Sequence, residues 1–364
     1  MKHIYFIMFF VFVLLTSNTS ATMGISTAGD KILSPGVIML LLGDDPGDDP
    51  AEVNEWEVME PMPEARAFHA VVADSDGYLY VIGGSSDAQG MNPTDTLFRY
   101  DTTNDKWDEL EPLPANLFEI DAEVIDGKIY VPGNLSTANT YVYDINNQDP
   151  DQDPWSVIPA DNGYTERAYY RTVAIGSDLY VLGGLVNTNG FRESTNEVWK
   201  LDTKQQTWSL GEPMLDDRIS FAAGVIKGSI YVAGGSSSSI PNILSGEVFS
   251  FTSNDWSAIT DIPDEGGNFW AYMADGNTED ALWLAGGKRD STHPTFANYH
   301  SGFYDPATNE WTDSTSDSVP TLNHGRSWLS GTVASDGYFY AIGGRDHSLI
   351  DPHIYDTNER LRVK

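Results

Sequence analysis

Pairs of an arginine and an aromatic residue, two positions apart, are the residues of this chain best suited to binding chemistry. An aromatic ring offers an apolar face to a sugar or a peptide side chain, and a guanidinium group can hold a carboxylate with two parallel hydrogen bonds. The repeated spacing therefore predicts a binding site, and an acidic glycan or peptide is the ligand it would favour. The pairs are Arg66 and Phe68, Arg167 and Tyr169, and Arg326 and Trp328.

Arg218 occupies the same place in a fourth segment, and aligned segments add further polar and aromatic positions. Basic residues also follow a pair of glycines in two late segments. The candidate ligand-binding residues are Phe68, Glu119, Tyr169, Phe269, Lys288, Arg289, Trp328 and Arg345. In the alternative interpretation, the four arginines hold loops through backbone carbonyls and the aromatic residues serve only for packing.

Catalytic and metal-binding patterns are weak. The seven histidines are scattered, and no arrangement of Ser, His and Asp stands out. Residues 149–153 alternate carboxylates as a calcium loop does, but Pro154 stands where that loop needs glycine and Ala160 where it needs glutamate. We therefore expect an acidic surface insert there, no metal site and no cofactor.

The elements that would position the candidate residues come from a repeat. Tryptophan recurs at intervals of about 50 residues, a period typical of repeat architectures. Each repeat contains four short runs rich in Val, Ile, Tyr and Phe, separated by turn residues, which predicts four antiparallel strands. The recurring residues are Trp56, Trp107, Trp155, Trp208, Trp256 and Trp311.

These repeats resemble the kelch family, whose repeat has a double glycine after its second strand and a tryptophan about seven residues beyond its third. Gly83 and Gly84 illustrate the first feature, and Tyr100 and Trp107 the second. The resemblance covers roughly residues 56–364 and implies a six-bladed β-propeller with four antiparallel strands per blade. Stacking blades in a closed ring buries both faces of each sheet, so we expect the tryptophans to lie between blades.

Enzymes of similar fold give three comparisons. Galactose-oxidase-type kelch enzymes need a cysteine cross-linked to tyrosine, and this chain has no cysteine. The sialidase box is not matched, because residues 75–77 fit a plain hairpin turn. Kelch-type N-acetylneuraminate epimerases use a glutamate and an arginine, roles that Glu119 and Arg345 would fill, although no local motif matches and the long insertion of that family is absent.

Trp56 precedes the first complete repeat, whereas the tail of the last repeat, residues 360–364, contains no tryptophan. We therefore predict that the N-terminal strand near Trp56 closes the ring by completing the sixth blade. The third strand of that blade is expected to end at residues 353–356.

Residues 1–21 are expected to be a signal peptide, with Lys2, an apolar run over residues 4–15, and cleavage after Ala21. Residues 22–51 form a leader, with an apolar octet at 36–43 and a linker rich in Asp, Pro and Gly. The propeller is expected to span residues 52–364.

The net charge of −34 disfavours nucleic acid as a partner, because phosphates are bound by basic residues. We expect a secreted or periplasmic monomer that does not insert in the membrane after signal cleavage. It would recognise a protein or an acidic glycan, without catalysis, through the face that carries the loops between the second and third strands of each blade. The alternative is a periplasmic sugar-modifying enzyme resembling the epimerases.

Overall fold

The computed structural model describes residues 55–147, 149, 151–263, 268–269, 271–289, 298–314, 318–346 and 352–363. The predicted signal peptide and leader lie outside this part, as do the side chains of Phe269 and Arg289. Within the described residues, no helix has the length and apolar character that crossing a bilayer requires.

The described residues form six four-stranded antiparallel sheets, so the all-β fold with four strands per sheet is confirmed. The first three sheets contain β2 (Ala70–Ala73), β3 (Tyr78–Ile82), β4 (Leu97–Asp101) and β5 (Lys106–Leu110); β6 (Glu123–Ile125), β7 (Lys128–Pro132), β8 (Thr140–Asp144) and β9 (Trp155–Ile158); and β11 (Arg171–Ile175), β12 (Asp178–Leu182), β15 (Val198–Asp202) and β16 (Thr207–Leu210). The other three contain β17 (Ala222–Ile226), β18 (Ser229–Ala233), β19 (Gly246–Ser250) and β20 (Asp255–Ile259); β22 (Ala274–Asn277), β23 (Leu282–Ala285), β25 (Ser301–Asp305) and β26 (Glu310–Asp313); and β27 (Ser330–Val333), β28 (Tyr338–Ile342), β29 (Asn358–Arg362) and β1 (Glu57–Met59).

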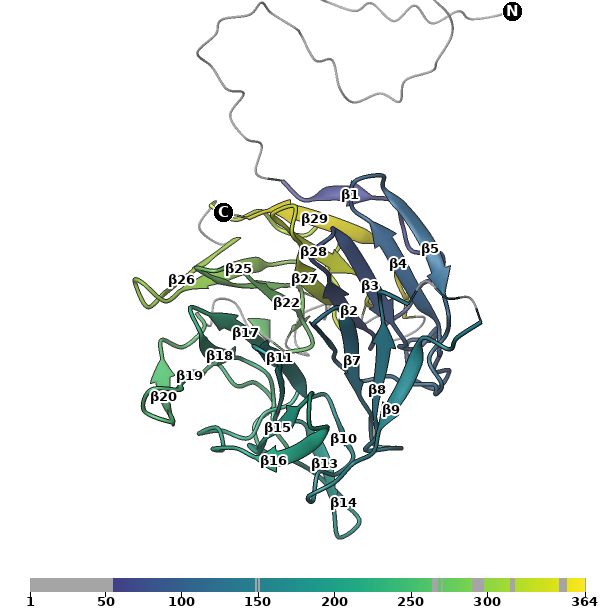
Figure 1. Ribbon diagram of the computed structural model, residues 1–364. Coiled ribbons are helices and arrows are strands. Elements are labelled where there is room, and N and C mark those ends of the chain that lie inside the picture. The colour runs from purple at the N-terminus through teal and green to yellow at the C-terminus, as the bar shows by residue number, and fades with distance from the viewer. Residues whose placement is uncertain are drawn as a thin grey trace, which may run out of the picture. The chain divides into compact units, whose positions relative to one another are not determined.

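The first strand of each sheet contacts the first strands of its two neighbours, in the order β2, β6, β11, β17, β22 and β27, and β27 in turn contacts β2. These inner strands therefore surround a common axis, with the other strands lying outside them (Figure 1), and a cavity lined by all six inner strands forms a central channel along that axis. The second strands are almost fully buried because adjacent sheets cover both of their faces, which explains their Val, Ile, Leu and Tyr content.

β1 pairs with β29, so the two ends of the described chain meet in one sheet. Figure 1 shows the purple β1 beside the yellow β29. Trp56 is 5% exposed, packs against Phe339, and donates from its indole Nε1 to the carbonyl of Pro320 at 3.2 Å.

Five of the six repeated tryptophans connect neighbouring sheets through their indole nitrogens. Trp107 donates to the Glu60 carbonyl, and Trp155 donates to the Glu111 carbonyl at 3.0 Å. Trp256 and Trp311 make equivalent bonds to Glu212 and Thr260, whereas Trp208 stacks on Tyr164 at 3.8 Å. Trp107 and Trp311 are partly exposed and the other four are buried. The contact with the neighbouring sheet is therefore common to all the repeated tryptophans, whereas full burial is not.

The third strand of the last sheet differs from the prediction. β29 spans Asn358–Arg362, and residues 353–356 precede it; Ile354 forms only an isolated bridge with Arg345. The prediction was wrong because Tyr355-Asp356 has the same Tyr-Asp ending as true third strands. The actual strand, β29, is held in the sheet by the buried side chain of Leu361 and by Glu359, which forms an ion pair with a buried arginine.

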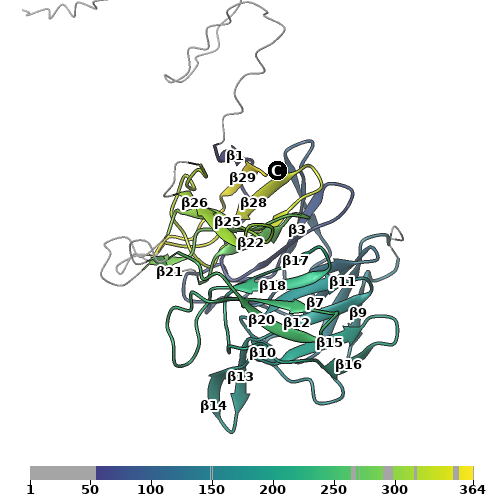
Figure 2. The ribbon, with the colours of Figure 1, turned by 90° about the vertical axis from the view of Figure 1, so that its left-hand side faces the viewer.

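One face of the propeller carries two sets of connections, and we call it the loop face. Segments that enter the first strands meet segments that leave the second strands through the bridges Ala67 to Ser85, Ile219 to Ser236 and Ser327 to Arg345. Two larger pairings on this face are β10 (Arg167–Ala168) with the hairpin β13 (Leu185–Thr188) and β14 (Phe191–Ser194), and β21 (Asn268–Phe269) with β24 (Lys288–Arg289). Figure 2 shows the β13–β14 hairpin standing out from the rest of the sheets.

The double glycines explain how these segments meet. Gly84 has a φ of +97°, and a Cβ there would lie 2.7 Å from the Ala67 carbonyl oxygen. Only glycine permits both this backbone conformation and so close an approach.

Candidate functional site

A closed ring of six backbone hydrogen bonds surrounds the axis on the loop face. Each sheet contributes one residue with positive φ, whose N–H donates to the carbonyl of the equivalent residue in the preceding sheet at 2.7–3.1 Å. The ring residues are Phe68, Glu119, Tyr169, Ser220, Tyr272 and Trp328. Because the backbone of each is fixed by two neighbours, their side chains are held in position around one opening.

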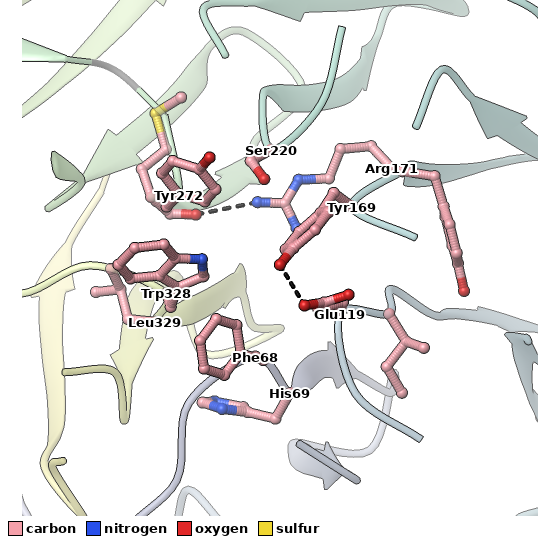
Figure 3. A pocket seen from close by; sticks show the side chains of 12 residues that line it. Phe68, His69, Glu119, Tyr169, Arg171, Ser220, Tyr272, Trp328 and Leu329 are labelled. Atoms are coloured by element: carbon pink, nitrogen blue, oxygen red, sulfur yellow. Dashed lines mark hydrogen bonds between the residues drawn. The ribbon is translucent and has the colours of Figure 1, made fainter. Parts of the chain in front are cut away.

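The ring residues line a cavity of about 40 Å³, together with His69 and Arg171 (Figure 3). Four of them, Phe68, Glu119, Tyr169 and Trp328, are candidate residues from the sequence, and Ser220 follows Arg218 at the same spacing. The fifth sheet is the exception. Tyr272, rather than Phe269, occupies its place, while the backbone of Phe269 pairs with Lys288 in the β21–β24 ribbon. The segment was misaligned because it has no arginine and because Tyr272 lies 16 residues after Trp256, whereas Glu119, which also has no arginine before it, lies 12 residues after Trp107.

Trp328 packs against two other aromatic residues of the ring, Tyr272 and Phe68, and a guanidinium group stacks on these residues. The Trp328 ring lies 4.4 Å from Tyr272 and 5.3 Å from Phe68, between ring centroids. Arg345 stacks on this group, with its Cζ 4.0 Å from the centre of Trp328. One Arg345 nitrogen donates to the Ala88 carbonyl, while its Nε is shielded from solvent and has no hydrogen-bond partner among the described residues.

No carboxylate of the described residues lies within ion-pair distance of Arg345. The charges of Asp87 and Asp346, which lie further away, favour its charged form. Burial lowers its pKa, yet an arginine stays charged at neutral pH. A stacked guanidinium with no ion pair to any described residue is suited to a carboxylate ligand.

Glu119 is the one acidic ring residue, and its carboxylate accepts a hydrogen bond from the Tyr169 hydroxyl. Burial raises the pKa of Glu119, and the Tyr169 bond partly opposes this shift. Lys288 is partly exposed, and its backbone N–H donates to the Ala271 carbonyl. The side chain of Arg289 lies outside the described residues, so its predicted role stays a prediction.

The four repeated arginines are buried to 0–1% exposure and therefore do not face a ligand. Arg66, Arg167 and Arg218 each donate to the carbonyl of a glycine that follows the second strand, at 2.8–3.2 Å. Each also has an acidic partner, such as Glu247 for Arg218 at 2.7 Å. Burial lowers the pKa of Arg66 to about 10. These arginines hold the loops together, as the alternative interpretation of the sequence proposed.

Arg171 lies in the central channel behind the ring. Its guanidinium pairs with Asp275 at 2.9 Å and donates to the carbonyls of Phe221 and Met273. Burial raises the pKa of Asp275 to about 6, although Arg171 opposes the shift. Burial also raises the pKa of Glu123 well above its ordinary value, with the charges of Asp121 and Asp275 adding to the effect.

His69, next to the ring, is expected to make the fold sensitive to acid. Burial, followed by the Arg66 charge, lowers its pKa to about 3. Between pH 6.5 and 3 the unfolded chain therefore holds a proton that the folded chain does not, so stability falls as the pH falls. At pH 4.5 the loss from this group is about 2–3 kcal/mol relative to pH 7.5.

Denaturant unfolding of wild type and a His69→Leu variant across this pH range measures the effect. The variant should lose less stability on acidification, whereas His353→Gln, a change at an exposed histidine, should behave as wild type. Equal pH dependence in wild type and His69→Leu would show that His69 is not buried in its neutral form.

The described carboxylates of the acidic insert lie at the surface. Asp151 and Asp153 are exposed, and Asp149 accepts a hydrogen bond from Gln152. Throughout the described part of the chain, no three acidic or histidine side chains are arranged to ligate a metal ion directly.

The outer loop face exposes large apolar side chains that sequence reasoning did not single out. Met91, Phe191 and Ile240 are 82%, 72% and 51% exposed, and each lies in a loop between the second and third strands of its sheet. Ser194 and Ser238 hydrogen bond to each other, which joins the hairpin of Phe191 to the loop of Ile240. The Asn189-Gly190 turn could have located this hairpin in the sequence.

Comparisons with known proteins agree with this architecture. A model of the KLHDC2/KLHL20/DRC7 kelch-repeats domain matches residues 49–235, and a model of the kelch motif matches residues 217–263. The chain is 28% identical over 260 residues to Kelch-like protein terF of Aspergillus terreus, covering 68% of this chain and 55% of that protein. It is 23% identical over 230 residues to Kelch-like protein 40 of Xenopus tropicalis, covering 63% and 33% respectively. The matches thus span about half or less of these relatives.

Proposed function

The chain belongs to the kelch-repeat family, and on this premise we propose that it is a binding domain that recognises a protein partner through its loop face. The observation that carries the proposal is the set of exposed apolar side chains Met91, Phe191 and Ile240 on loops of a rigid scaffold. Apolar side chains raised on loops are typical of protein interfaces, because they are desolvated only when a partner covers them.

A neighbouring groove supports a protein partner. A cavity of about 660 Å³ on the loop face is lined by Glu64, Asn92, Asp95, Asn116 and Ile354, among others. Its amide and carboxylate groups can bind polar side chains of a partner, while the apolar loop tips supply the contact area.

A loop-face variant tests this proposal. The triple change Met91→Ser, Phe191→Ser and Ile240→Ser should weaken binding at least tenfold to a partner captured from the source cells, purified and retested. The matched control is Val157→Ser with Leu210→Ser, because these residues are 45% and 61% exposed on outer strands. Equal loss of affinity in both variants, or no loss in the triple variant, would contradict the proposal.

A carboxylate-bearing ligand at the mouth is a second candidate, favoured by Arg345, which stacks on Trp328 and forms no ion pair with the described residues. Acidic glycans and acidic peptides share this chemistry, so arrays of both should be tested with wild type and Arg345→Ala. Binding to one array that is lost in the variant would support the candidate and identify its ligand class. Absence of binding to both arrays would count against it.

Export is part of the proposal and rests on the signal-like residues 1–21. Glycan binding and a monomeric state are likewise proposals. The enzymatic alternative requires Glu119 to act as an acid or base on a sugar. Its carboxylate already accepts a hydrogen bond from the Tyr169 hydroxyl, which would have to be broken or shared for that role.

A further inference from the structure

Four aromatic side chains and one carboxylate line the small cavity at the ring of backbone hydrogen bonds. The aromatic rings follow one another around the opening in the order Phe68, Trp328, Tyr272 and Tyr169 (Figure 3). Tyr272 contacts Trp328 at 4.4 Å and Tyr169 at 6.2 Å, between ring centroids. Glu119 completes the wall, and its carboxylate accepts the bond from the Tyr169 hydroxyl. The faces of aromatic rings attract cations, and cages of such rings bind quaternary ammonium groups.

The charges around this cavity favour a cation inside it. Arg171 also lines the cavity, but its guanidinium lies 2.9 Å from Asp275 and 4.0 Å from Asp121. Two carboxylates therefore neutralise its charge. Glu119 has no ion pair among the described residues, and the exposed Arg192 of β14 acts on it only from further away. A cationic ligand would supply the close partner that this partly buried carboxylate lacks.

Arg345 places a positive charge beside the same group of aromatic rings. Its Cζ lies 4.0 Å from the centre of Trp328 and 5.7 Å from that of Phe68. Phe68 lies between Trp328 and Glu119 in the order of the ring, so the two charges stand apart. A purely anionic ligand would bring its charge towards Glu119, and a purely cationic one would bring its charge towards Arg345. A ligand that carries both charges satisfies both groups.

The size of the cavity selects a small head group. Its volume of about 40 Å³ has room for about three water molecules. Three waters occupy about 90 Å³ of liquid, which is close to the bulk of one methylated ammonium group. A whole sugar ring exceeds this space, so a ligand of that kind would remain outside the aromatic rings.

We propose that this mouth, the ring cavity with Arg345 beside it, binds a small zwitterion of the betaine type. Its quaternary ammonium group enters the cavity, where the aromatic faces and Glu119 stabilise it, and its carboxylate accepts charge-assisted hydrogen bonds from Arg345. The inference rests on the second candidate of the proposed function and names the ligand class for it. A zwitterion has no net charge, so the protein's charge of −34, which repels anions, does not oppose its approach.

Isothermal titration calorimetry of the full-length protein with three probes at equal ionic strength tests the proposal. Glycine betaine carries both charges, tetramethylammonium chloride supplies the positive charge alone, and sodium acetate supplies the negative charge alone. Betaine should bind at least about tenfold more tightly than either of the other two, because a hydrogen bond to a charged group contributes about a factor of ten or more in affinity.

Three variants assign the two charges to their partners. Arg345→Ala should lower the affinity for betaine about tenfold and leave that for tetramethylammonium undiminished, which also shows that the cavity is intact. Glu119→Gln can still accept the bond from the Tyr169 hydroxyl, and it should weaken the binding of betaine and tetramethylammonium but not that of acetate. The matched control Arg362→Ala removes an arginine that stacks on Tyr338 of β28, and it should change none of the three affinities.

Equal affinities for betaine and acetate would overturn the zwitterion while leaving a carboxylate ligand, the second candidate, in place. Absence of betaine binding, equal affinities for betaine and tetramethylammonium, or unchanged betaine binding in Arg345→Ala would also overturn it. The protein partner of the loop face is tested separately by the triple loop-face variant, so failure of the zwitterion and failure of the protein partner are distinguishable.

Discussion

Deletion of residues 52–62 is expected to lower the Tm by about 10 °C or more. The deletion removes β1 and leaves one edge of β29 without its partner strand. It also removes the buried side chains of Trp56 and Met62, which are 5% and 3% exposed. Losing a buried tryptophan or methionine costs about 2–5 kcal/mol each, and in a domain of this size each kcal/mol lowers the Tm by about 2 °C.

Point substitutions on the same strand distinguish ring closure from mere loss of chain. Trp56→Ala should reproduce a large share of the effect, because it removes the contact with Phe339 and the bond to the Pro320 carbonyl. Val58→Ala should change the Tm by about 1 °C or less, because Val58 is 66% exposed. If the deletion melts as wild type does, β1 does not hold the ring closed.

Much of the fold was predictable because each repeat contains its own strand and turn chemistry. The tryptophan period located the sheets, since each indole is placed to contact the neighbouring sheet, as in the Trp155 bond to Glu111. The pattern was insufficient at the last sheet. Residues 353–356 imitate the end of a third strand, whereas β29 is fixed by the distant partners Arg326 and Met59, and such long-range contacts leave no local pattern.

The candidate site was predictable where a local anchor existed. An arginine two positions earlier located Phe68, Tyr169 and Trp328 on the ring. The second and fifth sheets have no such arginine; Glu119 was still located because it follows Trp107 by 12 residues, whereas Tyr272 follows Trp256 by 16 and Phe269 was aligned in its place. The sequence does not distinguish an arginine that binds a ligand from a buried arginine that holds loops together, because acidic partners such as Glu247 come from strands about 30 residues later.

The same reasoning gives a sharp test of the buried arginines. Arg326 and Glu359 are both 0% exposed and lie 2.6 Å apart, and Arg326 also donates to the Ala341 carbonyl. Arg326→Met should therefore destabilise the fold by about 3–5 kcal/mol, because it leaves the Glu359 charge buried and unpaired. This loss corresponds to a fall in Tm of about 6–10 °C.

Two further variants identify the cause of that loss. Adding Glu359→Gln to Arg326→Met should restore part of the stability, because the amide carries no charge and its oxygen can still accept the bonds from Asn323. Arg99→Met breaks the exposed pair with Asp108 and should cost less than about 1 kcal/mol. A normal Tm in Arg326→Met would instead mean that the ion pair of Arg326 does not stabilise the loops and that its guanidinium group is available to bind a ligand. Thermal unfolding of the three variants thus decides between the two interpretations of the repeated arginines without knowledge of the ligand.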